Sequence, residues 1–227
     1  MLHGYLSQKE SFLWQIKFFS RYYRVIAPDM TGFGENKGMS YPYSLCDYAD
    51  EIIRLVDELK IKKYDVLAHS FGARVAVKIA NRDERADRIV FTGAAGLKPR
   101  RGLKYLFKRA SFLLLKRLVP REKLAKFYST DYRSLSPVMK ESFKKIVAEN
   151  LDDEVKRIQN KCIVVSGKAD RETPPESQRK YARYIKNSER VCCYVLFRGL
   201  SAFPASYFSG GKRSRFFNNA AIYRKSF

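Results

Sequence analysis

Ser70 is the residue whose surroundings most favour covalent chemistry. Residues 64–73 read Tyr-Asp-Val-Leu-Ala-His-Ser-Phe-Gly-Ala, so a strand-like run leads directly into Ser70 and small residues follow it. A serine hydroxyl attacks a carbonyl carbon in acyl-transfer reactions when a neighbouring base accepts its proton. The segment predicts either a serine nucleophile or an ordinary turn between a strand and a helix.

Few residues of the chain could serve as the base beside such a serine, since the chain has two histidines. Asp170 follows an apolar run at 163–166 and precedes a Thr-Pro-Pro turn, a position that is typical of a solvated turn residue or a helix cap. The two histidines are His3 and His69. Because adjacent side chains diverge at a sharp turn, we expect the ring of His69 to pack inward and away from the Ser70 oxygen.

The four cysteines do not form a metal-binding pattern. Cys46, Cys162, Cys192 and Cys193 show no C-x-x-C spacing and have no histidine nearby. We expect them to be reduced thiols. The N-terminus lacks a basic segment followed by an apolar run, so we expect a cytoplasmic protein without a secretory signal.

Strand-like and helical segments alternate along most of the chain. We expect strands at 23–27, 64–68, 88–92, 162–166 and 191–197, because these short runs are rich in β-branched or aromatic residues. Apolar residues at helical spacing predict helices at 44–59 and 73–80. This alternation predicts an α/β fold with a mostly parallel sheet and flanking crossover helices.

Residues 97–158 interrupt the alternation with several expected helices and no convincing strand. An apolar stripe from Leu103 to Leu114 is flanked by many basic residues. Between Leu97 and Asn150 there are 15 Lys and Arg but only four acidic residues, a surplus of +11. We expect a basic helical cap, whose charge suits a solvated face, an anionic membrane or substrate, or a nucleic acid.

The segment around Ser70 resembles the nucleophile elbow of the α/β-hydrolases. In that family the turn strains the serine, and small residues on both sides let strand and helix approach closely. Gly72 fits the pattern, whereas Ala68 replaces the first glycine. His3 and Gly4 resemble the family's oxyanion loop, so the resemblance implies that the backbone amides of Tyr5 and Phe71 form an oxyanion hole.

Two further segments match the same family in the right order. Residues 25–34 resemble the fourth strand and its glycine-rich turn, whose role is mainly structural. Residues 163–170 resemble the strand-seven segment, which implies that Asp170 orients a catalytic histidine. The resemblance covers roughly residues 2–199 and implies no metal or organic cofactor.

The histidine that the family pattern requires is absent. Residues 199–204 read Gly-Leu-Ser-Ala-Phe-Pro, with Ala202 where the resemblance implies a histidine. Without that base Ser70 stays protonated and no acid protonates the leaving group. We therefore expect an incomplete triad and impaired hydrolysis.

The termini also depart from the family pattern. Family members carry three strands before the part that matches here, and residues 190–227 contain no Asp or Glu. We expect a chain truncated at its N-terminus with an altered end, although a divergent natural protein remains an alternative. The resemblance divides the chain into a hydrolase core at 1–96 and 159–227 and a cap at 97–158.

The composition of the sequence excludes some classes of protein. With 227 residues, 45% hydrophobic content and no apolar run of about 18 residues, the sequence excludes general disorder and a transmembrane protein. The formal charge of +22 favours anionic partners, but no RNA- or DNA-binding motif accompanies it. We expect a relative of serine hydrolases that act on small ester or acyl compounds. The alternatives are a binding protein without catalysis, or association with an anionic membrane or nucleic acid through the cap.

Overall fold

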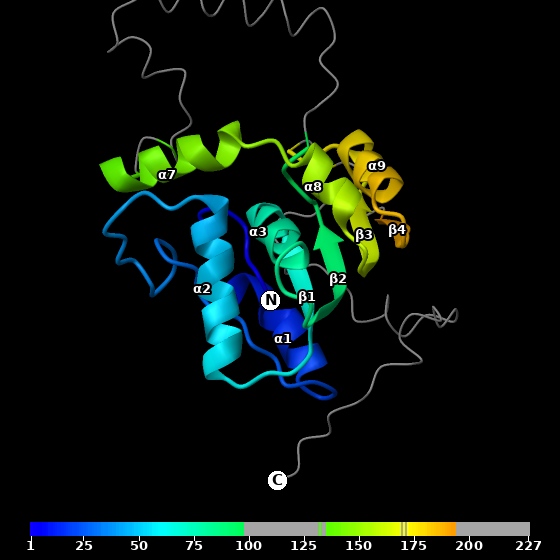
Figure 1. Cartoon of the computed structure of the whole chain (residues 1–227), viewed down its shortest axis with the longest axis horizontal. Coiled ribbons are helices and arrows are strands. Elements are labelled where there is room, and N and C mark those ends of the chain that lie inside the picture. Colours follow the sequence, from blue (N-terminus) through cyan, green and yellow to red (C-terminus); the bar gives the residue numbers. More distant parts are fainter. Residues whose placement is uncertain (98–131, 133–134, 169, 171, 194–227) are drawn as a thin grey trace, which may run out of the picture.

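The fold is built around a four-stranded parallel sheet (Figure 1). The computed structural model describes residues 1–97, 132, 135–168, 170 and 172–193. The strands lie in the order in which they occur in the chain: β1 (Tyr64–His69), β2 (Ala86–Thr92), β3 (Lys161–Gly167) and β4 (Ser188–Cys193). The expected α/β class is confirmed.

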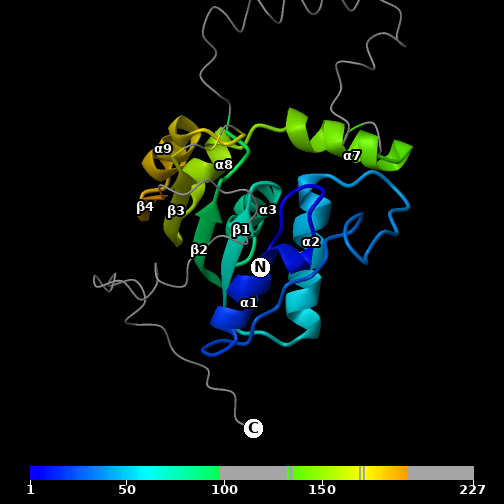
Figure 2. The ribbon, with the colours of Figure 1, turned by 180° about the vertical axis from the view of Figure 1, so that it is seen from behind.

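Helices flank this sheet. They are the 3₁₀-helix η1 (Lys9–Phe12), α1 (Leu13–Phe19), α2 (Leu45–Glu58), α3 (Phe71–Ala80), α7 (Pro137–Ala148), α8 (Asp152–Arg157) and α9 (Pro175–Tyr184). Helix α3 packs against β1 and β2, α9 packs against β3 and β4, and α2 packs against α3 (Figures 1 and 2). Ser44 begins α2 with a capping box, since its side chain accepts from the Asp47 amide and the Asp47 carboxylate accepts from the Ser44 amide.

Both faces of the sheet carry apolar side chains. Phe91 and Val164 belong to the main core, which α2 and α3 share. Their neighbours Ile163 and Val165 are also buried and form a separate cluster with the partly buried Val191. Strands of a parallel sheet are commonly buried on both faces, and for this reason they read as continuous apolar runs in the sequence.

The expected strand at 23–27 is wrong, because the structure assigns no strand there. Within the described residues, the backbone bonds of this segment are the one from the Tyr23 amide to the Phe19 carbonyl at 2.9 Å, at the end of α1, and the one from the Met1 amino group to the Ile26 carbonyl at 2.6 Å. The next residue in the chain, Leu2, forms an isolated parallel bridge with Ala68 of β1. A strand requires a ladder of hydrogen bonds to a neighbour, and a single bond does not supply one.

Helices α7 and α8 lie between β2 and β3 in the chain, within the expected cap. Residues 98–131, which hold the stripe from Leu103 to Leu114 and most of the basic surplus, lie outside the described residues. The division into a core and a cap therefore stays a prediction. None of the described helices has both the length and the apolar composition that a membrane crossing requires.

Candidate functional site

Ser70 occupies a strained turn between β1 and α3. Its backbone has φ +48° and ψ −105°, in the left-handed half of φ space that non-glycine residues rarely adopt. The Ser70 amide donates to the Thr92 carbonyl at 3.1 Å, which ties the turn to the end of β2. The half-buried serine therefore lies at the carboxyl edge of the parallel sheet, where active sites of α/β folds gather.

Gly72 allows the N-terminal segment to approach this turn closely. A Cβ atom on Gly72 would lie 2.2 Å from the Leu2 carbonyl oxygen and 2.8 Å from that of His3. The Gly72 amide instead donates to the His3 carbonyl at 3.0 Å. A small residue is thus required here by a specific backbone contact.

His3 fixes the loop that follows it. Its ring is fully buried, Nδ1 donates to the Gly4 carbonyl at 2.8 Å, and Nε2 accepts from the Met30 amide at 3.1 Å. Burial lowers the pKa of His3, although the hydrogen bond to Gly4 acts in the opposite direction and raises it. Both ring nitrogens are therefore occupied, and His3 holds the loop as a neutral side chain.

The loop brings Tyr5 next to the elbow. A Cβ atom on Gly4 would lie 3.7 Å from the Ser70 Cβ, and the rings of Tyr5 and Phe71 are 5.5 Å apart. Among the described residues, neither the Tyr5 amide nor the Phe71 amide has a hydrogen-bond acceptor. Two unpaired donors beside a serine have the composition of an oxyanion hole, and Phe71 adds the positive end of α3.

Asp170 lies at the same edge of the sheet, in the loop before α9. Its carboxylate accepts from the amides of Glu172 and Thr173, each at 2.9 Å, and from the Thr173 hydroxyl at 2.5 Å. A Cβ atom on Gly93, the residue after β2, would lie 3.4 Å both from Asp170 Oδ2 and from His69 Cε1. Asp170 therefore organises its own turn and also lies close to the elbow.

The ring of His69 points toward β2, as expected. Its Nδ1 donates to the Thr92 carbonyl at 3.0 Å. Burial lowers the pKa of His69, although the hydrogen bond to Thr92 and the charge of Asp170 oppose this shift. Neither histidine of the chain hydrogen-bonds to Ser70. Ala202 lies outside the described residues.

Aromatic rings form one side of the site. The ring of Tyr5 packs against Phe33 and Phe143, each at 5.0 Å between centroids, and Tyr132 packs against Phe143 at 5.5 Å. Phe143 belongs to α7, so the described part of the expected cap contacts Tyr5 directly. The half-buried rings of Tyr5, Tyr132 and Phe143 leave apolar surface beside the elbow.

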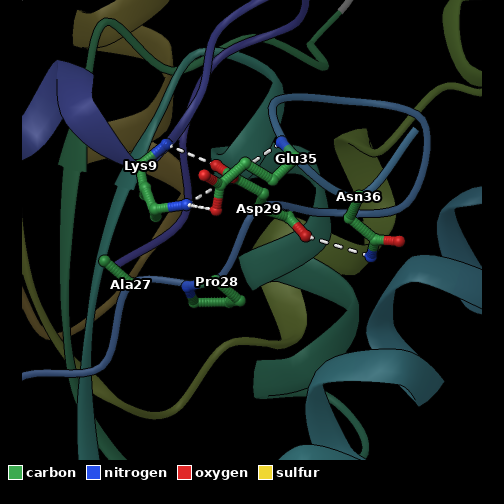
Figure 3. Close-up of a pocket in the computed structure, with 6 residues that line it drawn as sticks. All are labelled: Lys9, Ala27, Pro28, Asp29, Glu35 and Asn36. Atoms are coloured by element: carbon green, nitrogen blue, oxygen red, sulfur yellow. Dashed lines mark hydrogen bonds and ion pairs between the residues drawn. The ribbon is translucent and has the colours of Figure 1, made fainter.

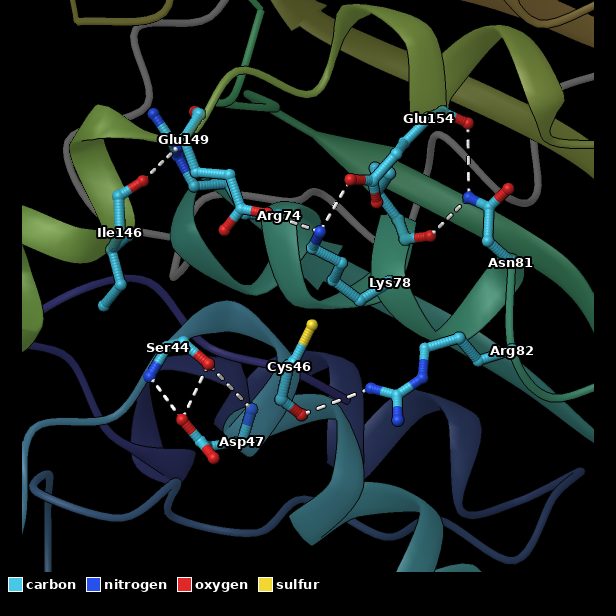
Figure 4. A network of polar contacts seen from close by, with 11 residues as sticks. Ser44, Cys46, Asp47, Arg74, Lys78, Asn81, Arg82, Ile146, Glu149 and Glu154 are labelled. Atoms are coloured by element: carbon cyan, nitrogen blue, oxygen red, sulfur yellow. Dashed lines mark hydrogen bonds and ion pairs between the residues drawn. The ribbon is translucent and has the colours of Figure 1, made fainter.

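A polar cluster on α3 anchors the connection between α7 and α8 (Figure 4). Arg74 donates to the Ile146 carbonyl at 2.7 Å, near the end of α7. Lys78 has a side chain only 8% exposed and contacts the carboxylates of Glu149 at 2.5 Å and Glu154 at 2.6 Å. Sequence reasoning missed this cluster, although two cations on an otherwise small and apolar helix were a usable signal.

One open cavity of the described residues is not lined by Ser70. It has a volume of about 460 Å³ and is lined by Lys9, Ala27, Pro28, Asp29, Glu35 and Asn36 (Figure 3). Asp29 accepts from the Lys9 amide at 2.6 Å and from Lys9 Nζ at 2.9 Å. Burial alone would raise the pKa of Asp29, but these hydrogen bonds hold it below its usual value. Lys9 thus pairs with both carboxylates of this cavity, Asp29 and Glu35.

No set of metal ligands accompanies these groups. Among the described residues, no cluster of three or more His, Cys, Asp or Glu side chains could hold a metal ion.

Comparison with known sequences identifies relatives over most of the chain. The profile of the Alpha/beta hydrolase family matches residues 1–198. A 2-hydroxymuconate semialdehyde hydrolase of Pseudomonas putida is 26% identical over 189 residues, which are 73% of this chain and 67% of that protein. A protein with the same name from Pseudomonas sp. (strain CF600) is 38% identical over 76 residues, so the aligned part spans 33% of this chain and 27% of that relative.

Solved structures show the same arrangement. A mutant of the meta-cleavage product hydrolase from Pseudomonas fluorescens IP01 has a TM-score of 0.59 at 25% identity, covering 82% of this chain and 76% of that one. A hydrolase from Pseudomonas aeruginosa has a TM-score of 0.68 at 19% identity, covering 92% and 85% respectively. At that identity the second likeness shows the fold alone.

Proposed function

The chain belongs to the alpha/beta hydrolase family, and from this membership we propose that it is a relative of serine hydrolases that act on carboxylic esters or similar acyl compounds. The observation that carries the proposal is the strained backbone of Ser70 at the end of β1, near the amides of Tyr5 and Phe71, which have no acceptor within the described residues. A positive φ at a serine is costly, and such strain accumulates at functional turns.

The proposed chemistry is acyl transfer through a covalent intermediate. The Ser70 oxygen attacks the substrate carbonyl carbon, and the negative charge that develops on the carbonyl oxygen is held by the two amides. The bond to the leaving alcohol then breaks, and water later releases the acyl group from the serine. A histidine would move the proton in each half of the reaction, and Asp170 would orient that histidine.

We propose that this chain performs the reaction poorly. His3 and His69 are both held by other partners, and the position where the family pattern has a histidine is Ala202. Loss of a triad member costs up to about a millionfold in turnover, whereas an oxyanion hole and binding alone retain about 10³ to 10⁴ over water.

A second candidate function is binding without catalysis. It is favoured by the combination of the loop at residues 3–5 beside Ser70 with two histidines that hydrogen-bond to other partners and not to Ser70. In this case the site would bind a small acyl compound and release it unchanged.

The aromatic side of the site suggests the kind of ligand. Tyr5, Tyr132 and Phe143 favour an apolar or aromatic group next to the reacting carbonyl. The Pseudomonas putida relative is named for 2-hydroxymuconate semialdehyde, which is a small molecule. We propose that the ligand of this chain is also a small molecule. The free thiols of Cys46, Cys162 and Cys192 support a reducing compartment such as the cytoplasm.

The test is to restore the base. The Ala202→His variant should hydrolyse an activated ester such as a p-nitrophenyl ester at least about 100-fold faster than the natural chain. Adding Ser70→Ala should abolish the gain, and Ala205→His, a neighbouring alanine in the same segment, should not reproduce it. If Ala202→His stays silent in a folded chain that still binds ester analogues, the binding function replaces the catalytic one.

A further inference from the structure

Helix α1 and the turn after it expose large apolar side chains to solvent. Leu13 is 61% exposed, Trp14 57% and Tyr22 48%, values that are unusual for residues of this size. The surface formed by residues 13–24, here called the α1 surface, lies at the end of the fold opposite α7 (Figures 1 and 2). It is therefore separate from α7.

The aromatic residues of the α1 surface are already packed against one another. Phe18 lies 5.2 Å from Phe19 and 5.9 Å from Tyr22, measured between ring centroids, and Phe19 lies 6.1 Å from Tyr23. Prearranged rings lose little conformational entropy when a partner binds. The surface is thus suited to a partner that accepts several aromatic side chains together.

The charge of the α1 surface has one sign. Lys17, Arg21 and Arg24 are all exposed, and residues 11–28 contain no Asp or Glu. Along the sequence, the three cations alternate with the aromatic residues. This distribution complements an extended anionic surface better than a single carboxylate or an acidic peptide.

We propose that the α1 surface docks onto an anionic lipid membrane, with Trp14 and Leu13 entering the interface and the three cations contacting lipid phosphates. Tryptophan and tyrosine favour the interface because their rings are apolar and their tips are polar. Basic side chains bury their aliphatic stems while their charged ends reach the headgroups. A seven-residue helix is about 10 Å long, so it lies on the membrane and does not cross it.

The chain provides its own reporter, since Trp14 is the only tryptophan. The full chain is mixed with vesicles of phosphatidylcholine containing roughly one third phosphatidylserine, a strongly anionic surface. Trp14 emission should shift to shorter wavelength and be quenched by brominated lipid, and salt should reverse both effects. Vesicles of phosphatidylcholine alone should produce no shift.

Matched charge variants distinguish the α1 surface from the total charge of the protein. Changing Lys17, Arg21 and Arg24 to Glu should weaken binding to anionic vesicles at least about 100-fold. The same charge change at Lys144, Lys156 and Arg179, exposed residues of α7, α8 and α9, should weaken it by less than about tenfold. Trp14→Ser, followed by vesicle sedimentation, should also weaken binding.

Three results would overturn the proposal. Binding that leaves the Trp14 emission unchanged would place the contact elsewhere on the protein, and equal weakening by both triple variants would indicate total charge alone. A blue shift that grows with protein concentration in the absence of lipid would show that the α1 surface packs against a second copy. None of these results depends on chemistry at Ser70, so the proposed hydrolase function is tested separately.

Discussion

The close approach of the N-terminal segment to the elbow depends on Gly72, so Gly72→Ala should destabilise the protein. The added Cβ would lie 2.2 Å from the Leu2 carbonyl oxygen and 2.6 Å from its carbon, and backbone atoms cannot rotate away as a side chain can. Three hydrogen bonds depend on this approach: Gly72 to His3 at 3.0 Å, Leu2 to Leu67 at 2.8 Å and His69 to Leu2 at 3.0 Å.

The expected loss follows from these bonds. At about 1 kcal/mol each, their weakening lowers the free energy of unfolding by about 3 kcal/mol, a large part of the stability of a typical domain. Urea denaturation measures this loss, and hydrogen exchange at the amides of Leu2 and His69 should accelerate together.

Gly38→Ala is the matched control. A Cβ on Gly38 would meet no atom within 4 Å, and its φ is not positive, so the substitution should leave stability unchanged or raise it by about 0.5 kcal/mol. A loss of less than about 1 kcal/mol for Gly72→Ala would refute the inference that this contact requires glycine.

Three further predictions concern the groups around the site. Lys78→Met should lower the free energy of unfolding by about 2 to 3 kcal/mol, because it leaves two partly buried carboxylates without their cation, whereas Lys156→Met, in an exposed pair, should cost less than about 1 kcal/mol. Since burial lowers the pKa of His69, its contribution to stability is complete above pH 6.5 and is lost as the pH falls below that value, so denaturation midpoints of His69→Asn should decrease less steeply than those of the natural chain as the pH falls below 6.5. Gly93→Ala should cost about 1 to 2 kcal/mol in the same assay, since φ is +52° and the added Cβ would crowd Thr173 and Asp170.

Each of these predictions has a contradicting outcome. An equal decrease in the free energy of unfolding for Lys78→Met and Lys156→Met would mean that burial does not strengthen the ion pairs of Lys78. An unchanged pH slope in His69→Asn would show that His69 does not remain neutral in the fold. A neutral Gly93→Ala would place the Asp170 loop farther from β2 than the structure does.

The sequence predicted the elements that have a strong local signal. Apolar runs bounded by turn residues located β1, β2 and β3 to within about two residues, and apolar spacing located α2. The turn at Ser70 was also predictable, because a strand, a small residue and a short helix follow one another without a gap.

Other features depend on contacts between distant parts of the chain. The run at 23–27 has the composition of a strand, but strand formation needs a neighbour that the described residues provide only at Met1. The bonds from Lys78 to Glu149 and Glu154 join residues more than 70 positions apart, which periodicity cannot reveal. The proximity of Asp170 to Gly93 likewise depends on how β2 and β3 pair in the sheet, because each residue follows the end of one of these strands.

We propose that Ser70 is a nucleophile without its base, and the most direct test is to identify the residue that an activated phosphonate ester labels. Such a reagent forms an adduct with a reactive serine that does not turn over, and peptide mass spectrometry locates it. Labelling of Ser70 should be slow in the natural chain, at least about 100-fold faster in Ala202→His, and absent after Ser70→Ala. Labelling at another residue, or equal labelling rates in the natural chain and in Ala202→His, would contradict the claim.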